Sequence, residues 1–127
     1  VLITMFANNI LGRFFILNVV FDKYQNEKVL AIQEDALKLL EENWSSVEES
    51  LTPLKKYCLA HNKDQIESGK VDNIFKYVIP RTIFVMRTPD KRSVALMCDY
   101  RFDPEHVIAL VFENESLSRI TEQDNVL

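Results

Sequence analysis

The chain has 127 residues, of which 47% are hydrophobic and 27% charged, as is typical of one globular domain over residues 1–127. Its 15 basic and 19 acidic residues give a net charge of −4, which disfavours nucleic-acid binding because a phosphate backbone requires a basic surface. With only two glycines, Gly12 and Gly69, the chain cannot build a glycine-rich phosphate-binding loop.

The N-terminal segment contains two β-rich stretches, over residues 2–6 and 13–21. Asn8, Asn9 and Gly12 supply turn chemistry between them, so we expect two strands joined by a turn. The second stretch (RFFILNVVF) is almost continuously apolar, which predicts a central strand or one covered on both faces. The apolar runs are far shorter than the ~20 residues of a membrane span and lack a signal-peptide pattern, so we expect a cytoplasmic protein.

The next segment has helical periodicity. Its apolar residues recur at spacings of three and four, at Leu37, Leu40, Trp44, Val47, Leu51, Leu54 and Cys58. This stripe predicts helices over residues 31–43 and 46–62. Ser46 and Glu49 match a capping box at the start of the second helix, and Pro53 should kink it or restart it with Thr52 as the cap.

The C-terminal half changes to a period of two after a short helix expected over residues 71–78 and ended by Pro80. Four strands are predicted, over residues 82–87, 93–102, 107–112 and 117–121. Their short connections indicate an antiparallel meander. The expected fold is therefore α+β: one antiparallel sheet of about six strands, in the order β-β-α-α-(α)-β-β-β-β, with helices packed on one face.

The densest polar cluster lies at a predicted turn and comprises Asp99, Asp103, Glu105 and His106. Carboxylates beside an imidazole suit a metal site or an acid–base pair. However, a catalytic zinc site usually uses more than one histidine, and turn chemistry alone accounts for Asp103 and the proline after it. We therefore predict neither a catalytic residue nor a cofactor, and keep a small metal-dependent hydrolase at this turn as an alternative.

The two cysteines, Cys58 and Cys98, have no metal-type spacing and are expected to be buried, reduced thiols. Cys58 and His61 are three residues apart on a predicted helix, so they could form a nucleophile–base pair. Cys58 also belongs to the apolar stripe, and this favours a role in the core.

Acidic side chains occupy the polar side of the predicted helices. An acidic surface favours encounters with a basic partner, although such a face can also be merely solvated. The candidate partner-binding residues are Glu41, Glu42, Glu48, Glu49, Asp99, Asp103, Glu105 and His106.

Two segments carry a resemblance to a known family. Residues 32–37 (IQEDAL) with 40–43 (LEEN) resemble the "Gln-x-x-Ala-Leu … Asn" helix of an uncharacterised bacterial domain family. Residues 98–106 (CDYRFDPEH) and the following VIALVF are similar to its "Asp/Trp-Asp-x-Glu-His-Gly" turn and strand, and residues 120–125 to its tail. The resemblance covers residues 14–127, with Val107 in place of the usual glycine and Phe102 in place of a frequent tryptophan.

This family looks like the small immunity proteins found beside bacterial toxins, including those of contact-dependent growth inhibition. The resemblance implies a cytoplasmic protein that binds a cognate toxin domain, a cationic nuclease for example, and occludes its active site without turnover. The other hypothesis left open is a self-associating structural domain that pairs through the strand at residues 2–6.

Overall fold

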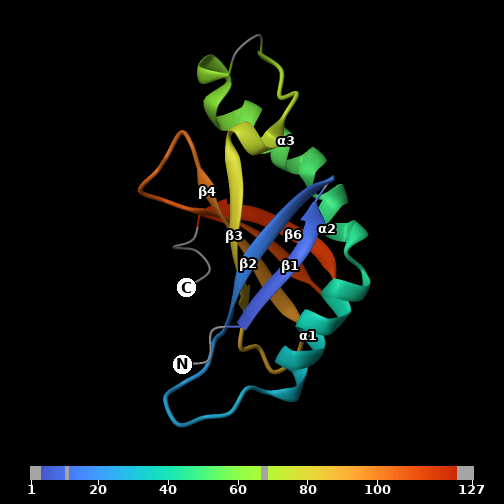
Figure 1. Cartoon of the computed structure of the whole chain (residues 1–127). Helices are drawn as coiled ribbons and strands as arrows, with labels where there is room; N and C mark the ends of the chain where they lie inside the picture. Colours follow the sequence, from blue (N-terminus) through green and yellow to red (C-terminus); the bar gives the residue numbers. More distant parts are fainter. Residues whose placement is uncertain (1–3, 11, 67–68, 123–127) are drawn as a thin grey trace.

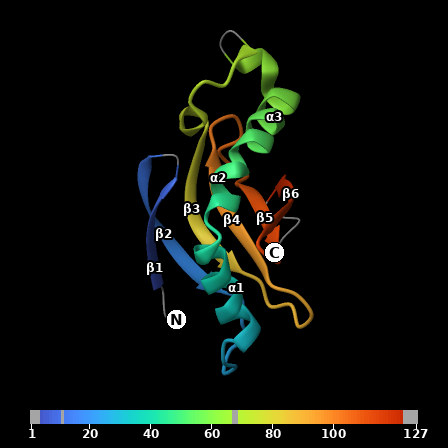
Figure 2. The same ribbon diagram turned by 90° about the vertical axis from the view of Figure 1, so that its right-hand side faces the viewer.

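The computed structural model describes residues 4–10, 12–66 and 69–122, which form a six-stranded sheet with helices along one face (Figures 1 and 2). The spatial order of the strands is β1-β2-β3-β4-β5-β6. The strands are β1 (Thr4–Ile10), β2 (Arg13–Phe21), β3 (Val78–Val85), β4 (Ser93–Tyr100), β5 (Ile108–Glu113) and β6 (Ser116–Glu122). The helices are α1 (Ala31–Glu42), α2 (Ser45–Glu49) and α3 (Leu51–Asn62), followed by the 3₁₀ turns η1 (Lys63–Gln65) and η3 (Ile74–Lys76).

The sheet is mixed, whereas the sequence predicted a wholly antiparallel one. Strands β2 and β3 pair in parallel, from Asn18 opposite Thr82 to Phe21 opposite Val85. The other four pairings are antiparallel, so the meander expected for β3 to β6 is confirmed. The parallel pair arises because the helices carry the chain back to the end of the sheet where β2 began, so β3 must run in the same direction.

The N-terminal hairpin differs from its prediction in two ways. Asn8 and Asn9 lie within β1, and Gly12 occupies the turn, with a φ of 80° that glycine adopts without strain. Residues 2 and 3 of the predicted first strand lie outside the described part of the chain. Strand β2 alternates between buried and exposed residues instead of being covered on both faces. The helices pack on one side of this sheet only (Figure 2).

The helical layer has a break that the periodicity did not locate. The chain forms α2 and α3 with Ser50 between them, not one helix over residues 46–62. Neither helix has a side-chain cap bond, so the capping box predicted at Ser46 and the cap predicted at Thr52 are both wrong. Pro53 lies in the first turn of α3, where its missing amide hydrogen costs no helical hydrogen bond.

A buried glutamine ties the start of α1 to the sheet. Gln33 is 1% exposed, and its Nε2 donates to the carbonyl oxygens of Asp22 at 2.8 Å and Val85 at 3.3 Å. Its Oε1 accepts from the backbone N–H of Leu30 at 2.9 Å. One side chain thus links the end of β2, the end of β3 and the first turn of α1, satisfying backbone groups that would otherwise be costly to bury.

The segment predicted as a helix over residues 71–78 contains only the short turn η3, and Val78 already belongs to β3. Asn73 caps this turn by accepting from the N–H of Phe75 at 3.1 Å. Pro80 lies inside β3, where the register with β4 shifts. Because β2 pairs with β3 only from Thr82 onward, Pro80 does not have to donate to that neighbour.

The main core lies between the helices and the inner face of the sheet, where apolar side chains of α1, α2 and α3 meet those of β2 to β5. A smaller cluster lies on the opposite, outer face and contains Ala95, Met97, Ala109 and Val111. Among the described residues, no helix is long and apolar enough to cross a membrane.

Candidate functional site

The first candidate surface is the outward side of α1 and α2, which we call the acidic helical face. Burial of Ala36, Leu40 and Val47 against the sheet fixes the rotation of these helices, so their polar residues point outward. Residues 31–50 contain six acidic side chains and one basic side chain, Lys38. The acidic residues are Glu34, Asp35, Glu41, Glu42 and Glu49, all exposed, and the half-buried Glu48.

The second group of predicted site residues lies at the β4–β5 turn and is organised in separate local pairs. The N–H of His106 donates to the carbonyl oxygen of Asp103 at 3.2 Å, which confirms the predicted turn, and the Nδ1 of His106 lies 3.0 Å from a carboxylate oxygen of Asp103. Asp99 forms an ion pair with Arg81 at 2.7 Å, and Glu105 is exposed. Figure 1 shows this turn on the far side of the molecule from α1 and α2, so the eight predicted residues do not form one site.

The geometry at the predicted polar positions bears on two arrangements, a metal site and a Cys58–His61 pair. Within residues 4–10, 12–66 and 69–122, no three His, Cys, Asp or Glu side chains come close enough to hold a metal ion. The Nδ1 of His61 lies 2.9 Å from the carbonyl oxygen of Tyr57, and its ring stacks on the Tyr57 ring, so these contacts give no pairing with Cys58.

Both thiols are free and buried, as predicted. Burial raises the pKa of Cys58 and of Cys98, so each thiol stays protonated where an exposed cysteine would ionise. Because the thiolate is the reactive form, neither cysteine is set up as a nucleophile.

The third feature, which the sequence reasoning missed, is an exposed apolar surface on the outer side of β1 and β2. We call it the hairpin face and define it by Met5, Phe14, Ile16 and Val20, which are 57%, 60%, 60% and 37% exposed. The continuous apolar run of residues 13–21 was the available signal. The prediction of a central strand is confirmed, because β2 lies between β1 and β3. The alternative, coverage on both faces, is wrong, because Phe15, Leu17 and Val19 point into the core while the intervening side chains meet solvent.

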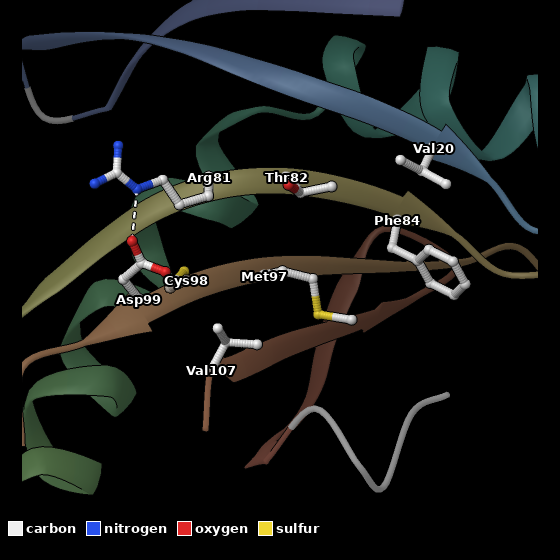
Figure 3. Close-up of a pocket in the computed structure, with 8 residues that line it drawn as sticks. All are labelled: Val20, Arg81, Thr82, Phe84, Met97, Cys98, Asp99 and Val107. Atoms are coloured by element: carbon white, nitrogen blue, oxygen red, sulfur yellow. Dashed lines mark hydrogen bonds and ion pairs between the residues drawn. The ribbon is translucent and has the colours of Figure 1, made fainter. Parts of the chain in front are cut away.

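A hollow of about 370 Å³ continues the hairpin face across β3 and β4 (Figure 3). Val20, Phe84, Met97 and Val107 contribute apolar side chains to it, and the Arg81–Asp99 ion pair lies at one end. The hollow is open and mainly apolar, and its single ion pair is exposed. Its size and lining suit the binding of an apolar side chain.

The outer edge of β1 is partly closed. The N–H of Asn9 donates to the side-chain oxygen of Asn8 at 2.8 Å, and the carbonyl of Asn9 accepts from the indole N–H of Trp44 at 2.8 Å. Alternate residues of a strand direct their backbone groups to the same edge, so those of Met5 and Ala7 also point outward. Among the described residues, nothing bonds these remaining groups.

Comparison with known proteins gives a family and no described activity. The family model described as "Domain of unknown function (DUF6985)" matches residues 3–127. No curated protein and no solved structure matches the chain.

Proposed function

We propose that this chain, which belongs to the family described as Domain of unknown function (DUF6985), is an immunity-type binding protein. It neutralises a cognate bacterial toxin in the cytoplasm by occluding the toxin's active site, without turnover. The acidic helical face is the observation that carries this proposal, because a nuclease toxin must present a cationic surface to its nucleic-acid substrate.

The helical layer is suited to rapid capture of such a partner. Its carboxylates belong to helices whose buried side chains hold them against the sheet. The arrangement of negative charge is therefore fixed before a partner binds. Opposite charge on the two surfaces accelerates their encounter and orients it. α1 and α2, with 12 and 5 residues, are about 18 and 8 Å long, and a typical interface buries roughly 800 Å² per partner.

The direct test uses the product of the neighbouring upstream gene, which this proposal expects to contain a toxin domain. We expect a stable 1:1 complex and loss of toxin activity at one equivalent of the chain. Absence of both binding and inhibition contradicts the proposal.

Charge reversal tests the surface itself. The double variant Glu41→Lys/Glu42→Lys should lower the association rate about tenfold at low salt, and the difference should shrink as salt screens the charges. The matched control, Asp64→Lys/Asp90→Lys, makes the same change in net charge at exposed positions away from α1 and α2. If the control slows association as much as the helix variant does, net charge matters and the acidic helical face does not.

A further inference from the structure

The exposed large apolar side chains of this protein are gathered in one part of the chain. All five that the structure describes, Met5, Phe14, Ile16, Val20 and Tyr24, lie within its first 24 residues. Four of them form the hairpin face, and Tyr24 lies in the loop after β2. Exposed large apolar side chains that gather on one face often mark an interaction surface, whereas single scattered ones do not.

Charge indicates what covers this face. The chain has 19 acidic residues, and the first of them is Asp22. Arg13 is the one charged residue before it, and its guanidinium lies over the rings of Phe15 and Phe75 on the inner side of the sheet, at 5.1 and 5.6 Å. The outer side of β1 and β2 therefore carries no charged side chain. Two copies of an acidic chain repel each other over much of their surface, but at this face they can meet without bringing carboxylates together.

We propose that the hairpin face is the interface between two copies of this chain, related by a two-fold axis. In such an isologous contact the same patch serves both copies. Two sheets packing face to face lie about 10 Å apart with their strands near 30° to one another. This inference is independent of the toxin proposed above, which is assigned to the opposite side of the sheet.

The hollow fits this arrangement. Phe14 and Val20 are six residues apart on β2, or about 20 Å along the strand. A two-fold axis near Leu17, midway between them, places Phe14 of one copy over Val20 of the other and Ile16 over the exposed Asn18. Val20 lines the hollow of about 370 Å³ together with Phe84 and Met97. The hollow of each copy can therefore accept Phe14 of the other copy. The interface thereby extends beyond the four side chains of the hairpin face toward the roughly 800 Å² per copy that a stable dimer buries.

The edge of β1 is a poorer route to self-association. Asn9 is already bonded on that edge, so within the described part of β1 only Met5 and Ala7 offer open backbone groups. Two residues give too short a ladder to hold two molecules together. Pairing through the edge would also leave Phe14 and Ile16 in water.

Sedimentation velocity over a range of micromolar concentrations tests the dimer. The 14.8 kDa chain should sediment at twice its monomer mass, and Ile16→Glu should weaken the dimer by roughly 30-fold or more. Tyr24→Glu is the matched control, because it also replaces an exposed large side chain with a carboxylate but lies outside the hairpin face. Both variants should keep the circular dichroism spectrum and melting temperature of the parent, since neither side chain is in the core. A chain that remains monomeric at all concentrations, or a dimer that survives Ile16→Glu, overturns the proposal.

Cross-linking tests the register. An equimolar mixture of the single variants Phe14→Cys and Val20→Cys should form a covalent dimer with a thiol-reactive cross-linker that spans about 10 Å, the separation expected between two packed sheets. The mixture of Phe14→Cys and Tyr24→Cys should cross-link much less, and the native thiols are buried in both mixtures. Equal yields from the two mixtures refute the placement of Phe14 over Val20.

Discussion

The two sides of β2 are equally apolar in sequence, yet one lies under the helices and the other faces solvent. Phe15, Leu17 and Val19 are at most 8% exposed, whereas Phe14 and Ile16, on the same strand, are 60% exposed. The helices that cover the inner side of β2 contain more acidic than basic residues, and most of these acidic side chains are exposed to solvent. The molecule therefore presents an acidic helical face on one side of its sheet and an apolar hairpin face on the other.

This contrast shows that the modest net charge conceals a strong segregation. Arg13 is the only charged residue before Asp22, so residues 1–21 carry +1, and the other 14 basic and 19 acidic residues give −5 thereafter. The two faces therefore suit different partners. Salt should weaken binding at the acidic face, whereas an apolar interface should be little affected.

The largest expected effect comes from detaching the helical layer from the sheet. Gln33→Leu removes three hydrogen bonds and leaves the N–H of Leu30 and the carbonyls of Asp22 and Val85 without this partner. Urea unfolding should show a loss of about 3 kcal/mol. The control Gln65→Leu removes an exposed contact with Asn62 and should cost less than about 0.5 kcal/mol. An equally small loss for Gln33→Leu would show that the helical layer does not depend on this link.

An intermediate effect is expected from alkaline pH, at a buried thiol on the inner side of the sheet. Burial raises the pKa of Cys98, so the folded state keeps the thiol protonated. This contribution is fully present below the unfolded pKa near 8.5 and is lost as pH rises toward the folded value, because the unfolded thiol ionises first. Between pH 8 and 10, the free energy of unfolding of the parent should fall by about 2 kcal/mol more than that of Cys98→Ala. Parallel pH profiles would contradict this account.

The smallest effect is expected at the neighbouring residue of β4, on the outer side. Asp99 pairs with Arg81 at 2.7 Å, but both side chains are more than half exposed. Because water screens such a pair, Asp99→Asn should change the free energy of unfolding by less than about 0.5 kcal/mol. The same urea titration measures it, and a loss above about 1 kcal/mol would mean that this exposed ion pair stabilises the fold as a buried contact does.

The local elements could be predicted from the sequence with useful accuracy. The predicted second strand has the bounds of β2, and the predicted first helix differs from α1 only at its end. These elements were accessible because residue periodicity reflects the local geometry of a strand or helix. The turn at Asp103 to His106 was predictable for a similar reason, since its proline and aspartate act within four residues.

The candidate site was predictable only in part. The acidic side of α1 follows from the helical stripe, but nothing local showed that the β4–β5 turn lies on the other side of the molecule. The hairpin face was hidden for a related reason. An apolar run reads the same whether both of its sides are covered or one is left open.

The sequence by itself determined the class of most secondary-structure elements, the charge segregation between residues 1–21 and the rest, and the burial of the two thiols. Only the tertiary structure decided that β2 and β3 run in parallel, that Gln33 bridges them to α1, and that one side of β2 stays uncovered. The physical reason is that local conformation depends on neighbours in the chain, whereas coverage depends on which distant element returns to which side of the sheet. The acidity is a property of the composition and could be read from the sequence, whereas the exposure of the hairpin face depends on tertiary packing.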